Sequence, residues 1–213
     1  MKLVTVYSDS HCQMLVKYFM RSATKFFESI TAIKIPQFGE GTYGKLGWSQ
    51  AVLQKVRAIH EFGLANQNGQ ICYADADVVF VKDPVEDMSE RLKTNLIVAQ
   101  KDRRQYCSGF FAINCNSEGL QFLSDWLVLK SDLNKTHDQP LFNQVINELP
   151  PKTPAFGLDE EEYWTPGNKG NGDWSMLGEN ELALPPVNAK VIHANWIHGV
   201  LRKERFMEAI GQF

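Results

Sequence analysis

Two aspartates one residue apart follow an apolar run, and they are the residues of this chain best suited to chemistry. The stretch ICYADADVVF (71–80) ends an expected strand at Asp75-Ala76-Asp77 and then returns to apolar residues. Neighbouring carboxylates repel each other unless a cation or a polar group lies between them. Mg²⁺ and Mn²⁺ take oxygen ligands, often one or two carboxylates together with phosphate oxygens. Asp75 and Asp77 therefore indicate a metal clamp for a nucleotide diphosphate, with a solvated acidic turn as the alternative.

Two features near the C-terminus carry complementary chemistry. VIHANW (191–196) reads as a late strand, and its His193 is a reasonable ligand for Mn²⁺, less so for Mg²⁺. Gly199 lets backbone approach a phosphate, and Lys203, next to Arg202, can neutralise a diphosphate leaving group. The alternatives are a packed or surface histidine and the solvated charge of a terminal helix.

A polar pair and a lysine are further candidates. In HDQPLFNQ (137–144), Asp138 and Gln139 precede an expected helix, where an aspartate commonly serves as the N-cap. An Asp-Gln pair that faces a cleft can instead hydrogen-bond sugar hydroxyls. Lys55 lies on the helix before the first aspartate, and it either reaches a phosphate or lies exposed on the helix surface.

These residues lie on alternating strands and helices. Apolar runs predict strands at 2–8, 30–35, 71–74, 78–81, 96–100, 108–114 and 191–196. Helical spacing predicts helices at 14–26, 48–63, 116–130 and 140–148. This alternation favours an α/β sheet with helices on both faces. Such sheets bind ligands at the carboxyl ends of their strands, where Asp75 and Asp77 are expected.

The segment 157–180 has no periodicity and is rich in glycine, acidic and aromatic residues. Long loops in compact domains are often functional. We expect either an acceptor-binding lid or an ordinary surface excursion. Trp164 and Trp174 are expected to be exposed in it, where they would stack on an acceptor sugar or anchor the loop.

The composition favours one soluble α/β domain over residues 1–213. The net charge of −3 gives no reason to expect nucleic acid or an anionic membrane as a partner. No window approaches a transmembrane segment, and MKLVTVYSDSH is too short an apolar run for a signal peptide. The four cysteines lack CxxC spacing and are expected to be reduced core residues: Cys12, Cys72, Cys107 and Cys115. A cytoplasmic location is therefore expected.

Four segments together resemble a known family. DADVVFVKDP (75–84), with Lys55 twenty residues ahead of the first aspartate, is followed in order by SGFFAIN (108–114), HDQPLFNQ (137–144) and HANWIHGVLRK (193–203). This set resembles the nucleotide-diphospho-sugar transferase family of retaining glycosyltransferases with a GT-A fold, a Rossmann-like mixed sheet flanked by helices. The resemblance covers about residues 48 to 203.

The resemblance implies transfer of a hexose or pentose from a UDP-sugar to a hydroxyl of a carbohydrate or glycoconjugate acceptor, with retention. It also implies Mn²⁺ (or Mg²⁺) held by Asp77 and His193, with Asp75 shared between metal and ribose. The remaining implied contacts are Tyr7 and Ser8 beside the uracil or ribose, Gly199 and Lys203 near the diphosphate, and Lys55, Ser108, Gly109, Asp138 and Gln139 around the donor sugar. Gln139 or a backbone oxygen would stabilise an oxocarbenium-like state while the departing phosphate helps deprotonate the acceptor.

Two other classes use the same residues differently. A HAD-like phosphatase would be phosphorylated on Asp75 and use Asp77 as an acid, but that family carries the motif after its first strand. Here at least two strands precede the motif, and Gly172-Asp173 is a poor match for the second acidic pair. The other class is a nucleotide-sugar-binding protein without turnover, which would keep the same binding residues.

Overall fold

Six strands form a central mixed sheet in the computed structural model, which describes residues 1–39, 46–135, 137–150, 154–166 and 184–210. The order in the sheet is β2-β1-β3-β6-β5-β7. The strands are β1 (Lys2–Tyr7), β2 (Ile30–Lys34), β3 (Gln70–Ala74), β5 (Ile97–Asp102), β6 (Gln105–Asn114) and β7 (Ala155–Gly157). β1 pairs in parallel with β2 and β3, whereas β6 runs antiparallel to both β3 and β5. The mixed sheet follows from this pairing.

The central strands are apolar on both sides because both faces of the sheet are covered. In β1, Val4 packs into one core and Leu3 into the other. In β3, Tyr73 packs into the same core as Val4, and Cys72 packs into the same core as Leu3. Strands buried on both faces read as continuous apolar runs rather than as alternating patterns. This explains why the runs at 2–8 and 71–74 predicted the strands that the structure forms at Lys2–Tyr7 and Gln70–Ala74.

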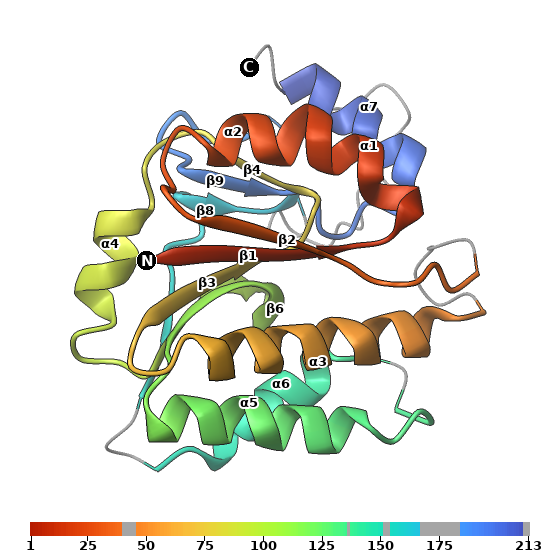
Figure 1. Cartoon of the computed structure of the whole chain (residues 1–213). Helices are drawn as coiled ribbons and strands as arrows, with labels where there is room; N and C mark the ends of the chain where they lie inside the picture. Colours follow the sequence, from red (N-terminus) through yellow and green to blue (C-terminus); the bar gives the residue numbers. More distant parts are fainter. Residues whose placement is uncertain (40–45, 136, 151–153, 167–183, 211–213) are drawn as a thin grey trace.

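Helices cover the two faces of the sheet in separate layers (Figure 1). One layer holds α3 (Trp48–Ala65), α5 (Ser117–Lys130) and α6 (Gln139–Glu148). The other holds α7 (Val200–Ile210) and a continuous helical run made of η1 (Asp9–His11), α1 (Cys12–Met14), the π-helical η2 (Leu15–Met20) and α2 (Arg21–Ala23). The short α4 (Val85–Arg91) lies at the side of the sheet. The expected α/β class, with helices on both faces, is confirmed.

A second, three-stranded sheet brings the Asp75-Ala76-Asp77 motif and His193 together. The order in this sheet is β4 (Val78–Phe80), β9 (Val191–His193) and β8 (Tyr163–Trp164). β4 pairs antiparallel with β9, and the register puts Val78 opposite His193. The Ala194 amide also donates to the Asp77 carbonyl oxygen at 3.0 Å. Backbone pairing therefore brings His193 beside the two aspartates.

Two expectations about the last third of the chain are wrong. The strand expected at 191–196 forms only over Val191–His193, and the left-handed φ of 68° at Trp196 excludes that residue from a strand. The segment 157–180 is not one aperiodic loop, because β7 ends in it and Tyr163–Trp164 form β8. Residues 167–180 of the expected lid lie outside the described residues.

The expected exposure of Trp164 and the expected burial of Cys12 are also wrong. Trp164 is buried, and its ring stacks on Phe206 of α7 with centroids 6.3 Å apart, so it anchors the segment rather than facing solvent. Trp174 lies outside the described residues. Cys12 is exposed, whereas the other three cysteines are buried, and all four are free thiols. Within the described part of the chain, no helix combines the length and apolarity needed to span a bilayer.

Candidate functional site

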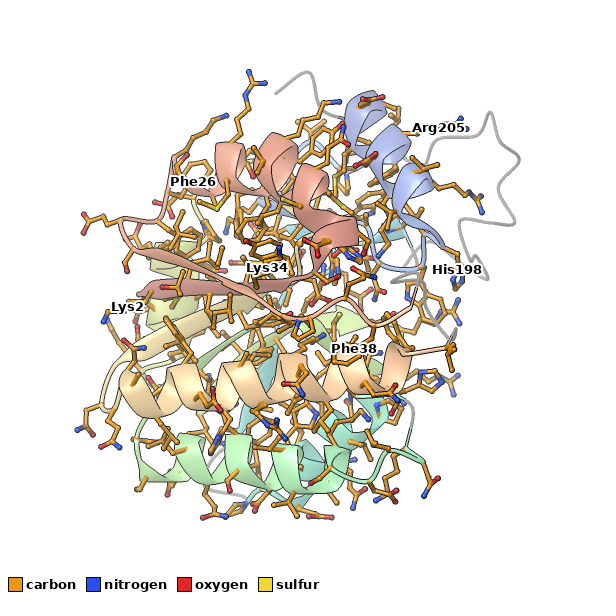
Figure 2. The ribbon with its side chains drawn as sticks, turned by 45° about the vertical axis from the view of Figure 1, so that its right-hand side comes forward. Lys2, Phe26, Lys34, Phe38, His198 and Arg205 are labelled. Atoms are coloured by element: carbon orange, nitrogen blue, oxygen red, sulfur yellow. The ribbon has the colours of Figure 1, made fainter. Side chains whose placement is uncertain are left out.

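A cavity of about 670 Å³ opens at the carboxyl ends of β1 and β3. Phe38, which follows β2, and His198, which precedes α7, line it and are labelled in Figure 2. The contacts and metal ligands implied by the resemblance all line this one cavity: Tyr7, Ser8, Lys55, Asp75, Asp77, Ser108, Gly109, Asp138, Gln139, His193, Gly199 and Lys203. Fold and sequence thus place the candidate residues together, whatever their individual roles.

Asp75, Asp77 and His193 form a group suited to a cation. One ligand atom of each lies within 4.8 Å of the others. His193 Nε2 is 3.3 Å from Asp77 Oδ1 and 3.9 Å from Asp75 Oδ2. Two carboxylate oxygens with one imidazole nitrogen suit Mn²⁺, and the carboxylates also suit Mg²⁺. The donor set fits the metal that the sequence led us to expect.

Gly109 of β6 has no side chain, and this leaves space for the Asp75 carboxylate and the His193 ring. A Cβ at position 109 would come within 2.5 Å of Asp75 Oδ2 and of His193 Cε1. The Gly109 carbonyl also accepts the Asp75 amide at 2.8 Å. The absence of a side chain at this strand position is therefore required by the carboxylate and imidazole beside it.

A chain of hydrogen bonds fixes which nitrogen of His193 faces the carboxylates. The Gln100 Nε2 amide donates to the carbonyl oxygens of Tyr163 and Trp164, at 3.0 and 3.2 Å. Its Oε1 therefore accepts from His193 Nδ1 at 2.8 Å. Metal-bound histidines commonly use such a partner to set their tautomer and ring orientation. Gln100 thus leaves Nε2 to face Asp77 and Asp75.

Two cations balance the buried Asp77 carboxylate. Lys203 of α7 forms an ion pair with Asp77 Oδ2. Burial disfavours the charged form, but Lys203 and His193 hold the pKa of Asp77 well below its usual range. Burial likewise opposes protonation of His193, yet the Asp77 carboxylate raises the pKa of His193 to about 10. The site therefore strongly favours positive charge beside this carboxylate.

Asp138 precedes α6 but does not cap it. Its side chain makes no capping hydrogen bond. The carboxylate instead accepts from Lys55 at 2.9 Å and from Ser108 Oγ at 3.1 Å. Although burial opposes it, Lys55 lowers the pKa of Asp138. The helix-cap explanation is thus wrong for this side chain, which is turned towards the cavity side of the fold.

Lys55 joins the two halves of the site. Its ammonium group lies 3.1 Å from Asp75 Oδ1 as well as 2.9 Å from Asp138. Despite burial, Asp138 and then Asp75 raise the pKa of Lys55 well above its usual range. The Tyr73 hydroxyl donates a further hydrogen bond to Asp75. Lys55 is consequently neither exposed nor held apart for a phosphate in this structure.

The start of α7 completes the wall near the carboxylates. Gly199 has a φ of 90°, a conformation that L side chains rarely adopt. Its carbonyl accepts the Lys203 amide at 3.1 Å, so the helix begins directly after it. This turn brings both Lys203 and the helix N-terminus to the cavity, and helix N-termini favour phosphate.

Several cavity residues were not identified from the sequence. His11 follows Tyr7 and Ser8, and burial together with the nearby Lys203 lowers its pKa. Asp102, at the end of β5, accepts hydrogen bonds from three side chains: Gln139 Nε2 at 2.9 Å, Asn195 Nδ2 at 3.1 Å and Trp196 Nε1 at 2.7 Å. Asn195 and Trp196 stand in the quoted HANW motif, whereas nothing in the sequence distinguished Asp102 or His11.

Comparisons with known proteins agree with this geometry. The family model described as nucleotide-diphospho-sugar transferase matches residues 3–207. No curated protein matches the sequence significantly. Among solved structures, a glycosyltransferase involved in the glycosylation of the major capsid of PBCV-1 has a TM-score of 0.65 at 7% identity, over 98% of this chain and 100% of that one.

Two other solved structures show the same fold. The apo form of the glycosyltransferase GlyE of Streptococcus pneumoniae TIGR4 has a TM-score of 0.58 at 12% identity, over 90% of this chain and 53% of GlyE. An active-site mutant of LgtC, with glutamate in place of a glutamine, has a TM-score of 0.54 at 11% identity, over 100% of this chain and 97% of that one. The likeness establishes a GT-A fold. On the match over residues 3–207, this chain belongs to the nucleotide-diphospho-sugar transferase family.

Proposed function

We propose that this protein transfers a sugar from a UDP-sugar to a hydroxyl group of a carbohydrate or glycoconjugate acceptor, with retention of anomeric configuration and dependence on Mn²⁺ or Mg²⁺. Membership of the family supports a nucleotide-sugar donor and a transferase reaction. The UDP donor, the metal dependence and the retention are the finer parts of the proposal. A cytoplasmic location is expected together with it.

One observation carries the proposal most directly. A cation-binding group and a cationic side chain meet at one end of the cavity, since Asp75, Asp77 and His193 lie within 4.8 Å and Lys203 pairs with Asp77. A diphosphate needs such a combination, because a metal and a lysine together neutralise the charge that develops as it leaves. When bound, the metal would supply Lewis-acid stabilisation of the departing UDP.

In this proposal, the other cavity residues bind different parts of the donor. Lys203 and the N-terminus at Gly199 bind the diphosphate, and Tyr7 and Ser8 bind the nucleoside. Asp138, Ser108, Gly109 and Lys55 orient the donor sugar, a role supported by the Lys55–Asp138–Ser108 contacts at 2.9 and 3.1 Å. Polar groups with fixed partners suit sugar hydroxyls because each is already held in one geometry.

Retention needs the new bond on the face of the sugar from which the diphosphate departs. In our proposal, the bond from the anomeric carbon to the diphosphate oxygen breaks, and the acceptor oxygen bonds to that carbon. The acceptor proton passes to the departing diphosphate. Gln139 stabilises the oxocarbenium-like state with its amide oxygen.

Release of UDP from a panel of UDP-sugars tests this proposal, with and without EDTA and with Mn²⁺ restored afterwards. We expect UDP to be released from at least one donor. EDTA should abolish this release, and added Mn²⁺ should restore it. Proton NMR of the product from a suitable acceptor then reports the anomeric configuration, which we expect to match the donor.

Three outcomes would oppose different parts of the proposal. UDP binding without turnover on any donor would favour a nucleotide-sugar-binding protein. Full activity in EDTA would contradict the metal dependence. An inverted product would contradict retention and the part given to Gln139.

A further inference from the structure

Asp102 lies at a junction of three segments around the cavity. It ends β5 and is 3% exposed, yet it lines the cavity. Its Oδ2 accepts from Gln139 Nε2 at 2.9 Å and from Asn195 Nδ2 at 3.1 Å. Its Oδ1 accepts from Trp196 Nε1 at 2.7 Å. One buried carboxylate thus joins the start of α6 to the segment between β9 and α7.

The chemistry of these groups determines how the Gln139 amide lies. A carboxylate oxygen only accepts hydrogen bonds, and an amide has one donating and one accepting end. The NH₂ end of Gln139 must therefore face Asp102, which leaves its Oε1 as the end that is available to a ligand. The two ends are nearly the same in shape, so the hydrogen-bond partner alone chooses between them.

Two unusual backbone conformations lie next to the Asp102 junction. Arg103 and Trp196 both have left-handed backbones, with φ of 58° and 68°, although neither is glycine. Such conformations persist only where neighbouring contacts enforce them, and they cluster at functional sites. The Arg103 guanidinium lies 4.1 Å from the centroid of the Trp196 ring, and the indole N–H of the same ring is bound to Asp102.

We propose that Asp102 is a positioning residue that directs the Gln139 amide oxygen towards the anomeric centre of the donor sugar. The inference rests on the proposed function for its catalytic meaning, because Gln139 is there the group that stabilises the oxocarbenium-like state. Asp102 itself does not touch the reacting atoms. Asp102 binds the NH₂ end of the Gln139 amide and so keeps that donating end from facing the cavity.

The substitution Asp102→Asn tests this with little change of shape. Rotated to keep Oδ1 as the acceptor for Trp196, the new side chain places its NH₂ where Oδ2 was, against the Gln139 and Asn195 amides. We expect Gln139 to turn over and kcat to fall about 10- to 100-fold, the size associated with one hydrogen bond to a charged group. The KM for the donor should stay within about twofold, because a group that acts in the transition state affects kcat.

The double variant Asp102→Asn with Gln139→Glu provides a rescue. The amide at 102 can then donate to a carboxylate at 139, which again presents an oxygen to the cavity. We expect its kcat to exceed that of Asp102→Asn alone. A merely structural role of Asp102 would give no such rescue, since the two changes would then add.

Asp125→Asn is the matched control. On the surface of α5, Asp125 Oδ1 accepts from Gln121 Nε2 at 2.8 Å, so an aspartate–glutamine pair of the same kind meets here, and neither residue is among those that line the cavity. We expect this variant to keep wild-type kcat and KM. Equal losses in both variants would overturn the proposal, because a general effect of the charge would then explain them.

A readout without turnover separates this inference from the proposed function. In ¹H–¹⁵N spectra of Asp102→Asn, we expect the Gln139 side-chain amide signals to shift, whereas the backbone amide signals of β1 and α5 stay in place and report a preserved fold. Unchanged Gln139 signals would overturn the inference even if the enzyme is active. Shifted signals in a protein that turns over no donor would support the positioning and contradict only the proposed function. If Asp102→Asn does not fold, hydrogen exchange in the wild type tests the inference instead: the Gln139 side-chain NH₂, bound to the buried Asp102, should exchange more slowly than that of Gln121 on the surface of α5, and equal exchange would overturn the inference.

Discussion

At the scale of single residues, hydrogen-bond partners decide what each functional group presents to the cavity. His193 directs Nε2 at the two aspartates because Gln100 binds Nδ1 at 2.8 Å. The orientation of Gln100 is in turn set by two carbonyl oxygens of β8. Neither contact is encoded by local spacing, since Gln100 and His193 are 93 residues apart.

Gln100→Leu should therefore weaken the metal site while its ligands remain. Loss of such a supporting partner typically lowers metal affinity about 10- to 100-fold. Titration of Mn²⁺ in the presence of saturating UDP measures the change. Gln70→Leu is the control, because Gln70 also donates from a strand, to Asn114 Oδ1 at 3.2 Å. Unchanged Mn²⁺ affinity in Gln100→Leu would refute the role given to Gln100.

Gly109→Ala should abolish Mn²⁺-dependent UDP binding. The added Cβ would meet Asp75 Oδ2 and His193 Cε1 at 2.5 Å, so at least one of these two side chains must move. Calorimetry with UDP and Mn²⁺ measures the loss, and circular dichroism verifies the fold. In the control Gly157→Ala, the Cβ meets only the flexible side chain of Lys101. Normal binding in Gly109→Ala would show that this crowding is unimportant.

At the scale of elements, the small sheet and α7 position the cationic part of the site. β9 pairs with β4 and places His193 beside Asp77. α7 packs through Phe206 and Met207 onto a core that includes residues of β4, β8 and β9. This packing fixes the helix that carries Lys203, so two distant segments of sequence meet at one carboxylate.

Phe206→Ala should cost both stability and nucleotide binding. Removal of a fully buried phenylalanine costs about 3–5 kcal/mol of unfolding free energy. Because Phe206 anchors α7, UDP affinity should fall as well. Urea unfolding and UDP titration measure the two effects separately.

Asn116→Ala is the control for a loss of stability alone. The Asn116 side chain accepts the Gly119 amide at 2.9 Å as the N-cap of α5, so its loss should cost about 1 kcal/mol. UDP affinity should not change, since the cap lies outside the described cavity. If Phe206→Ala binds UDP as tightly as the wild type does, α7 does not position a diphosphate group.

At the scale of the whole molecule, the sequence predicts what depends on local pattern. Continuous apolar runs and helical spacing predicted the α/β class, and the order of motifs predicted the family. The sequence could not distinguish Asp138 as a cap from Asp138 as a partner of Lys55, because that depends on a side chain 83 residues earlier in the chain. The end of β9 was also missed, because the left-handed backbone of Trp196 depends on contacts with the turn at Arg103.

The grouping of Asp102, Gln139 and Trp196 shows the same limit. These residues come from the end of a strand, the start of a helix and an irregular segment, and only the folded chain brings them together. By contrast, Asp75, Asp77 and His193 were predicted together because they belong to motifs whose order carries the resemblance. Their meeting within 4.8 Å agrees with that prediction of a metal site.

The central claim is that this cavity binds a UDP-sugar through a metal held by Asp75, Asp77 and His193. Calorimetric titration of UDP, with and without Mn²⁺, tests it most directly in the wild type, in Asp77→Ala and in the surface control Asp125→Ala. We predict Mn²⁺-dependent binding in the wild type and in Asp125→Ala. In Asp77→Ala the affinity should fall about 10- to 100-fold or more, since a charged ligand is lost. Equal binding by Asp77→Ala and the wild type, or no UDP binding under any condition, would contradict the account.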